Sequence, residues 1–340
     1  CRALLHTTQA SVVGMSPPEI ERDDQRSLGV VGEGAALAAL LPLLPSAGLA
    51  TLGPGDDSAV LGVPDGRVVI SCDMMIEGPD FRRDWSSLGD VGFKAIASNA
   101  ADIAAMGAVV TGYEIAVAAP PATTVGELKE LARGFAEGIA ALTPGAGVLG
   151  GDLSRSPVFT IAVTVLGDLE GLAPVTRAGA RPGNVLALAG ERGLSHRGLT
   201  LLRAAPDAAA LHALREGNAS VAHHLRPVPP VPLGPVAAQA GATAMMDVSD
   251  GLVLDATRMA RASGVQMELD SALEWDESSL FGGEDHGLLA CFPAGVDLPA
   301  GFIAIGVVQG PTAQAPVVLA GYDLQSSLGG WDPFGDHVAE

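Results

Sequence analysis

The chain has 340 residues, long enough for two domains with a sizeable core, and 48% of its residues are hydrophobic while only 4% are aromatic. Its 19 basic and 39 acidic residues give a formal charge of −20, which excludes a surface suited to nucleic acid or to anionic membranes. The 44 glycines and 24 prolines follow no collagen period and indicate an α/β protein with many tight turns.

Cysteine usage and the absence of long apolar runs indicate the compartment. The three cysteines are scattered and form no CxxC pair, which is typical of a reducing environment. No apolar run approaches the ~20 residues of a membrane span, and residues 1–14 lack the pattern of a signal peptide. We therefore expect a cytoplasmic protein in which residues 1–26 form a disordered extension.

Residues 27–168 are expected to form the first domain. In chain order, the patterns predict a helix over 33–41, a buried strand over 67–71, a helix over 88–106, a strand over 109–119, a helix over 125–141, a strand ending at 149 and a strand over 157–166. The helix over 88–106 is the clearest, because its apolar residues recur at helical spacing. Ala95, Asn99 and Asp102 share another face of this helix, where small side chains leave room for a ligand.

The pattern starts over near Gly167–Gly171, so residues 169–340 are expected to form a second α/β domain. The predicted elements are strands over 185–189, 243–246, 288–292 and 302–308, and helices over 193–204 and 250–263. Ser249 or Asp250 is predicted to cap the last of these helices.

Five stretches place carboxylates beside glycines or at predicted strand ends. They are Gly55-Asp56-Asp57, Ser71-Cys72-Asp73, Gly150-Gly151-Asp152, Asp247-Val248-Ser249-Asp250-Gly251 and Gly282-Gly283-Glu284-Asp285. Clustered carboxylates repel one another unless cations lie among them, and Mg²⁺ prefers such hard oxygen ligands. The sequence therefore predicts a magnesium-lined site for a phosphate-rich substrate.

Each stretch also has an ordinary structural interpretation. Asp56-Asp57 could be a plain turn, Asp102 a solvated helix position, and Asp247 and Asp250 helix caps. Arg177 is either a phosphate clamp or half of a surface ion pair. His223-His224 are expected to be a surface pair, and Cys72 a small buried residue. No P-loop, convincing Rossmann fingerprint or HExxH motif is present.

Taken together, these motifs resemble the thiamine-monophosphate kinase family of the aminoimidazole ribonucleotide synthetase-like superfamily. The likeness rests on the acidic stretches above, on Lys94-Ala95 through Asn99 to Met106-Gly107, and on Thr176-Arg177 and Leu225-Arg226-Pro227. These motifs extend from about Gly53 to Trp331 and follow one another in the same order as in the family. It implies a two-domain α/β (α+β) fold in which the N-terminal domain binds ATP and Mg²⁺ and forms a homodimer through its sheet. The C-terminal domain would contribute to the nucleotide and substrate sites.

The resemblance also implies the reaction and the residues that perform it. The expected reaction is direct in-line transfer of a phosphoryl group from ATP, the co-substrate, to thiamine monophosphate, assisted by several Mg²⁺ ions and giving thiamine diphosphate. By position, the metal ligands would be Asp57, Ser71, Cys72, Asp73, Asp102, Asp152, Asp247 and Asp250. The residues expected to carry the transfer are Asp57, Asp73, Asp102 and Asp152, and those contacting ATP are Gly151, Asp152, Arg177 and Ser249. The thiamine end would meet Asp80, Glu284 and Trp331.

Four features distinguish this sequence from the family pattern at the thiamine end. The segment between Leu269 and Phe281 is shorter than is usual, and Pro333 precedes Phe334 where a histidine is usual. Asp80 stands where a substrate-contacting histidine is usual, and His286-Gly287 replace an aromatic-acid pair. Two other interpretations are compatible with the motifs. One is an ATP-using enzyme of the same superfamily with a different acceptor, and the other is a non-catalytic divalent-cation-binding protein.

Overall fold

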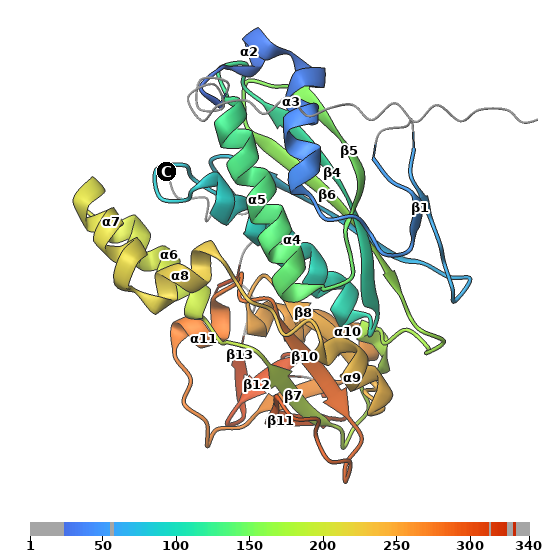
Figure 1. The fold of residues 1–340 in the computed structure, drawn as a ribbon. Coiled ribbons are helices and arrows are strands. Elements are labelled where there is room, and N and C mark those ends of the chain that lie inside the picture. The colour runs from blue at the N-terminus through green and yellow to red at the C-terminus, as the bar shows by residue number, and fades with distance from the viewer. Residues whose placement is uncertain (1–23, 55–57, 313, 325–328, 331–340) are drawn as a thin grey trace, which may run out of the picture.

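The computed structural model describes residues 24–54, 58–312, 314–324 and 329–330. They form two α/β domains, drawn one above the other in Figure 1, with one long helix, α4, lying against both. None of the described helices is long and apolar enough to cross a membrane.

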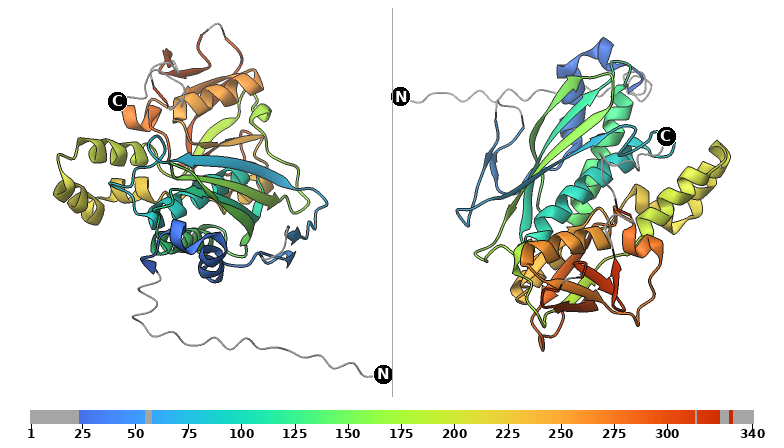
Figure 2. Two further views of the ribbon diagram at one scale, coloured as in Figure 1. Left: turned by 90° about the horizontal axis from the view of Figure 1, so that it is seen from above. Right: turned by 180° about the vertical axis from the view of Figure 1, so that it is seen from behind.

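The N-terminal domain contains a four-stranded sheet and two long helices. Its elements are α2 (Leu28–Val31), α3 (Glu33–Leu40), a 3₁₀ turn η1 (Leu41–Leu43), β1 (Ala50–Leu52), β2 (Val60–Leu61), β3 (Val69–Ile76), α4 (Leu88–Ala105), β4 (Val109–Ala119), α5 (Val125–Leu142), β5 (Val148–Arg155) and β6 (Thr160–Asp168). The sheet has the order β3-β6-β4-β5, and only β4 and β5 run parallel. The helices α4 and α5 lie on the same side of it (Figures 1 and 2).

Strand β3 differs from its prediction in length, burial and the place of Asp73. The prediction of a buried strand over 67–71 that ends before Asp73 was wrong, because β3 continues to Ile76 with Asp73 at its centre. Alternate residues of a strand point to opposite faces of the sheet. Ser71, Asp73 and Met75 therefore face α4, while Ile70 and Met74 face the other side and are 62% and 58% exposed. The sheet has one helix-covered face and one open face, which is apolar along β3.

The Gly150-Gly151-Asp152 stretch also lies within a strand, so the prediction of a strand that ends at 149 was wrong. It forms the centre of β5, where Gly151 pairs with Ile115 of β4. A Cβ on Gly151 would lie 1.8 Å from the carbonyl oxygen of Ile115, so only glycine fits. The glycine permits close strand contact here instead of chain reversal.

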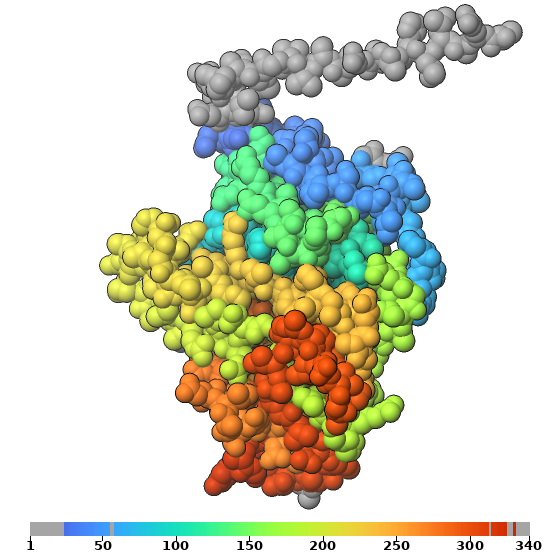
Figure 3. All heavy atoms as spheres, turned by 60° about the horizontal axis from the view of Figure 1, so that its bottom comes forward, coloured from blue at the N-terminus to red at the C-terminus, as the bar shows by residue number. Residues whose placement is uncertain are grey.

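The C-terminal domain is built around a seven-stranded sheet of order β13-β12-β9-β11-β7-β10-β8. Its elements are a 3₁₀ turn η2 (Arg177–Gly179), β7 (Val185–Ala189), α6 (Leu194–Ala204), α7 (Ala208–Gly217), α8 (Ala219–Leu225), α9 (Leu233–Gln239), β8 (Ala244–Val248), α10 (Leu252–Ser263), β9 (Gln266–Leu269), α11 (Glu277–Phe281), β10 (Gly287–Phe292), β11 (Phe302–Gln309), β12 (Val317–Leu319) and β13 (Tyr322–Leu324). The helices α6, α7 and α8 project from one side of the molecule (Figure 3).

Helix α4 joins the two domains. It begins with a capping box, in which the Ser87 hydroxyl accepts the Asp90 N–H and the Asp90 carboxylate accepts the Ser87 N–H. The same carboxylate receives the guanidinium of Arg226 from the second domain. Further along, Ile96 and Ile103 are fully buried in a core that also contains Met245 and Leu288 of the second sheet. Side chains on α4 are therefore held rigidly where the two domains meet.

Candidate functional site

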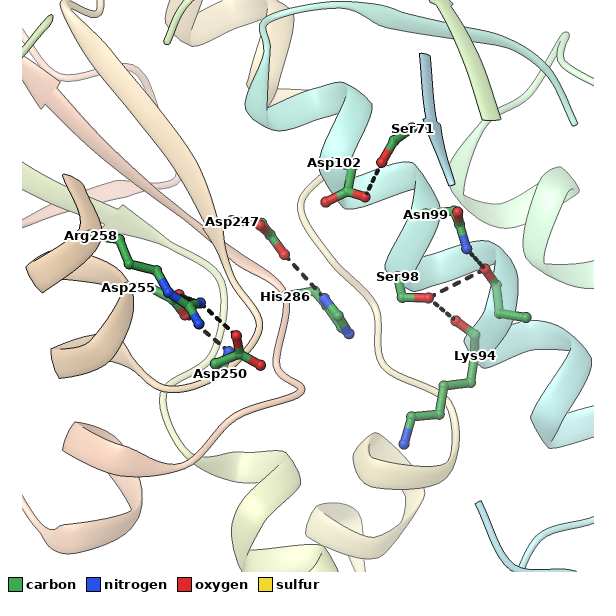
Figure 4. Close-up of polar contacts among 11 residues, drawn as sticks. Ser71, Lys94, Ser98, Asn99, Asp102, Asp247, Asp250, Asp255, Arg258 and His286 are labelled. Carbon is green, nitrogen blue, oxygen red and sulfur yellow. Dashed lines mark hydrogen bonds and ion pairs between the residues drawn. The ribbon is translucent and has the colours of Figure 1, made fainter. Parts of the chain in front are cut away.

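Three carboxylates from three separate elements gather where the domains meet. Asp73 comes from β3, Asp102 from α4 and Asp247 from the end of β8. The Ser71 hydroxyl donates to Asp102 Oδ2 at 2.7 Å (Figure 4), and the Asp73 N–H donates to Asn99 Oδ1 at 3.3 Å. The face of α4 predicted to leave room for a ligand thus carries the site.

The proximity of these carboxylates changes their protonation. Burial, followed by repulsion from Asp247 and Asp73, raises the pKa of Asp102 to about 7. Burial, with repulsion from Asp247 and Asp250, also raises the pKa of Asp73. Such a cluster holds all of its charges only when cations lie among them.

The donor set fits Mg²⁺. It consists of carboxylate and hydroxyl oxygens, which are hard ligands. Within the part of the chain that the structure describes, no group of three His, Cys, Asp or Glu side chains is arranged to hold a single ion. A Mg²⁺ ion held here would take its remaining ligands from water and substrate phosphates.

Asp250 is held by a polar network at the start of α10 (Figure 4). The prediction that Ser249 or Asp250 caps this helix was wrong, because Gly251 occupies the cap position without a side-chain bond. Instead, the Asp250 N–H donates to the buried Asp255 at 3.0 Å, and Arg258 bridges the carboxylates of Asp250 and Asp255 at 2.5 and 2.7 Å. Burial raises the pKa of Asp255 to about 7.

The loop from Gly282 to His286 runs beside the acidic cluster. The N–H groups of Glu284 and His286 donate to the carbonyls of Ser249 and Val248. A Cβ on Gly283 would lie 2.4 Å from the carbonyl oxygen of Ser249, so glycine permits this contact. His286 Nδ1 lies 3.3 Å from Asp247 Oδ2, and the hydrogen bond to Asp247 raises the histidine's pKa against the effect of burial.

A pocket of about 820 Å³ opens beside this loop. Its walls come from the segment after β3, from α6 and from the loop itself, and include Asp80, Trp85, Ser195, Arg203 and Glu284. Asp80 accepts the Ile76 N–H at 2.7 Å, and burial raises its pKa. Both described residues predicted to meet the thiamine end therefore line one pocket.

Some predicted site residues do not join the acidic cluster. The side chain of Cys72 is exposed on the open face of the sheet, so the prediction that it is buried was wrong. Across the sheet, Met74 of β3 is in register with Ala162 of β6, Ala116 of β4 and Asp152 of β5. Asp152 therefore lies on the same open face as Met74, but on the opposite edge strand. Asp57 and Trp331 lie outside the described residues.

Ser249 lies two residues after Asp247 in the chain, and Arg177 lies beside the start of β8 in space. The carbonyl of Thr176 accepts the Met245 N–H, so Arg177 enters beside the first residues of the strand that ends with Asp247. Its exposed guanidinium has no hydrogen bond or ion pair among the described residues. Both positions are compatible with a nucleotide approaching Asp247.

Sequence reasoning missed several polar residues of the site. His223-His224 were predicted at the surface, but His224 is buried, with Nδ1 2.9 Å from Ser195 Oγ. Burial and the nearby Lys94 lower its pKa to about 3, so the ring is neutral at physiological pH. Lys94 is one of only two lysines in the chain, and it shares a helix face with Asp102. That spacing was the signal available in the sequence.

Comparison with known proteins defines first the class and then the family. Residues 55–169 match the model "AIR synthase related protein, N-terminal domain", and residues 181–300 match the corresponding C-terminal domain. The chain is 42% identical over 304 residues to thiamine-monophosphate kinase of Mycobacterium tuberculosis, an alignment covering 84% of this chain and 86% of the relative. It is 38% identical over 307 residues to the same enzyme of Corynebacterium glutamicum, covering 82% and 88%.

A solved structure has a similar fold over most of its length. "AaThiL complexed with AMPPCP and TMP" superimposes with a TM-score of 0.68 at 28% identity, covering 82% of this chain and 91% of the other. The fold is thus that of the two-domain AIR synthase-related proteins, as predicted. Within that class, the chain belongs to the thiamine-monophosphate kinase family.

Proposed function

We propose that this protein transfers the terminal phosphoryl group of ATP to thiamine monophosphate, giving thiamine diphosphate and ADP. The observation that carries the proposal is the gathering of Asp73, Asp102 and Asp247 beside a pocket lined by Asp80 and Glu284. Family membership and the relative bound to AMPPCP and TMP support the same reaction. We place the activity in the cytoplasm, with residues 27–168 and 169–340 as the two domains.

An oxygen of the acceptor's phosphate forms a bond to the γ-phosphorus of ATP while the bond from that phosphorus to the β–γ bridging oxygen breaks. Because the attacking oxygen is already ionised, the protein needs no strong base and acts by alignment and charge neutralisation. Mg²⁺ would neutralise the phosphates when bound. In this proposal several Mg²⁺ ions would be shared among Asp73, Asp102 and Asp247. Arg177 would bind the nucleotide, and Asp80 and Glu284 would orient the acceptor.

One assay tests this function. The purified protein is incubated with ATP, Mg²⁺ and thiamine monophosphate, and thiamine diphosphate is measured by chromatography. We expect the product to form with Mg²⁺ and to be lost on chelation and in Asp102→Asn. ADP formed only with a different acceptor would contradict the proposed substrate, and no ADP under any condition would favour a cation-binding protein.

We further propose a homodimer through the open face of the N-terminal sheet. Ile70, Met74 and Ile76 are 62%, 58% and 37% exposed along one face of β3, an apolar surface of the kind that interfaces cover. Asp152 lies on the same open face. Because it is remote from Asp102 within one chain, we propose that it reaches the nucleotide bound by the partner subunit.

Mixing two inactive variants tests this arrangement. Asp102→Asn and Asp152→Asn homodimers should each be inactive. If one site combines Asp102 of one subunit with Asp152 of the other, a mixed dimer contains one intact site, and refolding an equal mixture should restore about a quarter of the wild-type activity. No recovery in a mixture shown by mass spectrometry to contain mixed dimers would place both residues in one chain's site.

A further inference from the structure

A buried lysine joins the acceptor pocket to the helix that carries the acidic cluster. Lys94 lies on α4 with only 6% of its surface exposed, and its Nζ donates to Glu284 Oε2 at 2.7 Å. Lysine is rarely buried unless a charged partner compensates it. The single partner that the described residues offer to this ammonium group is the Glu284 carboxylate.

Glu284 itself is held in an unusual backbone conformation. Its φ of 65° lies in the left-handed region, which non-glycine residues seldom adopt without a constraint. Hydrogen bonds of Glu284 itself and of the next residue, Asp285, hold the backbone in this conformation. The Glu284 N–H donates to Ser249, while the Asp285 carboxylate is fixed by the backbone N–H groups of Gly193 and Ser195 at the start of α6.

The two carboxylate oxygens of Glu284 have different surroundings. Oε2 is next to Lys94 at 2.7 Å and His224 Nδ1 at 3.4 Å. For Oε1 the described residues provide no hydrogen bond, and the side chain, 36% exposed, lines the pocket. Lys94 therefore engages one oxygen, and the other has no hydrogen bond from the described residues.

Helix α4 fixes the separation between Lys94 and the metal end of the site. Lys94, Ser98 and Asp102 recur every four residues, so they lie on one face of the helix, as Figure 4 shows. Eight residues at 1.5 Å each separate Lys94 from Asp102 by about 12 Å along the axis. An extended phosphate monoester whose far end carries a hydrogen-bond donor spans a distance of this order.

We propose that Lys94 is a positioning residue for the acceptor: by engaging one oxygen of Glu284, it aims the other at a hydrogen-bond donor on the acceptor's organic end. The proposal rests on the proposed function, and it adds a requirement for the acceptor. The molecule must present its phosphate at the Asp102 end of α4 and a donor group at the Lys94 end.

A double-mutant cycle tests this role, with steady-state kinetics for ATP and thiamine monophosphate measured separately. Lys94→Met should raise the KM for thiamine monophosphate about 10- to 100-fold, the range for losing a hydrogen bond to a charged group. The KM for ATP and kcat should stay within about threefold. Lys94→Arg should recover much of the loss, and Lys129→Met, which removes the chain's other lysine, should behave like the wild type.

The decisive comparison is between Glu284→Gln and the Lys94→Met/Glu284→Gln double variant. If Lys94 acts only through Glu284, the double variant should have the same KM for thiamine monophosphate as Glu284→Gln alone. The double variant also removes both charges together, so it stays informative if Lys94→Met fails to fold.

Additive losses, or an unchanged KM for thiamine monophosphate in a folded Lys94→Met protein, would overturn the role of Lys94. A wild-type protein that forms no thiamine diphosphate would instead overturn the proposed function, so the two failures are distinguishable.

Discussion

Asp102→Asn should stabilise the metal-free protein while abolishing turnover. The folded carboxyl has a pKa of about 7 against an ordinary 3.8, because it is buried near Asp247 and Asp73. The folded protein thus binds this proton more tightly than the unfolded chain, so raising the pH above about 4 favours unfolding until the pH passes 7. The raised pKa of Asp102 lowers the free energy of unfolding by about 4 kcal/mol at pH 8, and by less than about 2 kcal/mol at pH 5.

The assay is urea unfolding in the presence of a chelator at pH 5 and pH 8. Asparagine is nearly isosteric and keeps an oxygen for the Ser71 hydroxyl, so the variant should remove the charge without opening a cavity. We expect the variant to be more stable than the wild type, with the larger difference at pH 8. Adding Mg²⁺ and an ATP analogue should make the wild type the more stable of the two, because only the wild type is stabilised by binding them.

The control is Asp297→Asn, which changes an exposed carboxylate outside the site and should shift stability by less than about 0.5 kcal/mol at either pH. The reasoning would be refuted if Asp102→Asn were less stable than the wild type in the chelator, or if its advantage did not grow between pH 5 and pH 8.

Two further substitutions follow from local geometry. Gly151→Ala should destabilise the protein by about 2–4 kcal/mol in urea unfolding, because the added Cβ meets the Ile115 carbonyl oxygen, whereas Gly150→Ala, where the Cβ has open space, should be nearly neutral. Equal effects would contradict the strand geometry. Arg258→Met should raise the Mg²⁺ concentration for half-maximal activity about tenfold, because Arg258 orients Asp250. An unchanged Mg²⁺ requirement would exclude that role.

The sequence was sufficient for elements with a clear apolar pattern. The strand over 109–119 and the strand over 185–189 match β4 and β7 at both ends, and the helix over 88–106 matches α4 to within one residue. The side chains of α4 that recur with the helical period are buried, and β7 is an apolar run buried on both faces, so local pattern and tertiary packing agree. Short elements such as α11, β12 and β13 had too few residues to show a period.

The errors came from features that tertiary structure decides. Asp73 was placed at a strand end and Asp152 just after one, because glycine or a polar residue usually ends a strand. However, β3 and β5 form the two edges of the sheet and tolerate both. His224 was placed at the surface because no sequence pattern shows that α8 packs near Glu284. The number of acidic stretches was enough to predict that Asp73, Asp102 and Asp247 converge. That Asp152 lies apart from them could be found only from the register of the strands.

The central claim is that these acidic residues together bind a divalent cation with a nucleotide. Isothermal titration calorimetry with a non-hydrolysable ATP analogue tests it most directly, comparing the wild type and Asp102→Asn in Mg²⁺ and in chelator. We predict binding by the wild type in Mg²⁺, and at least tenfold weaker binding in chelator or in the variant. Equal affinity in all four titrations would contradict the claim.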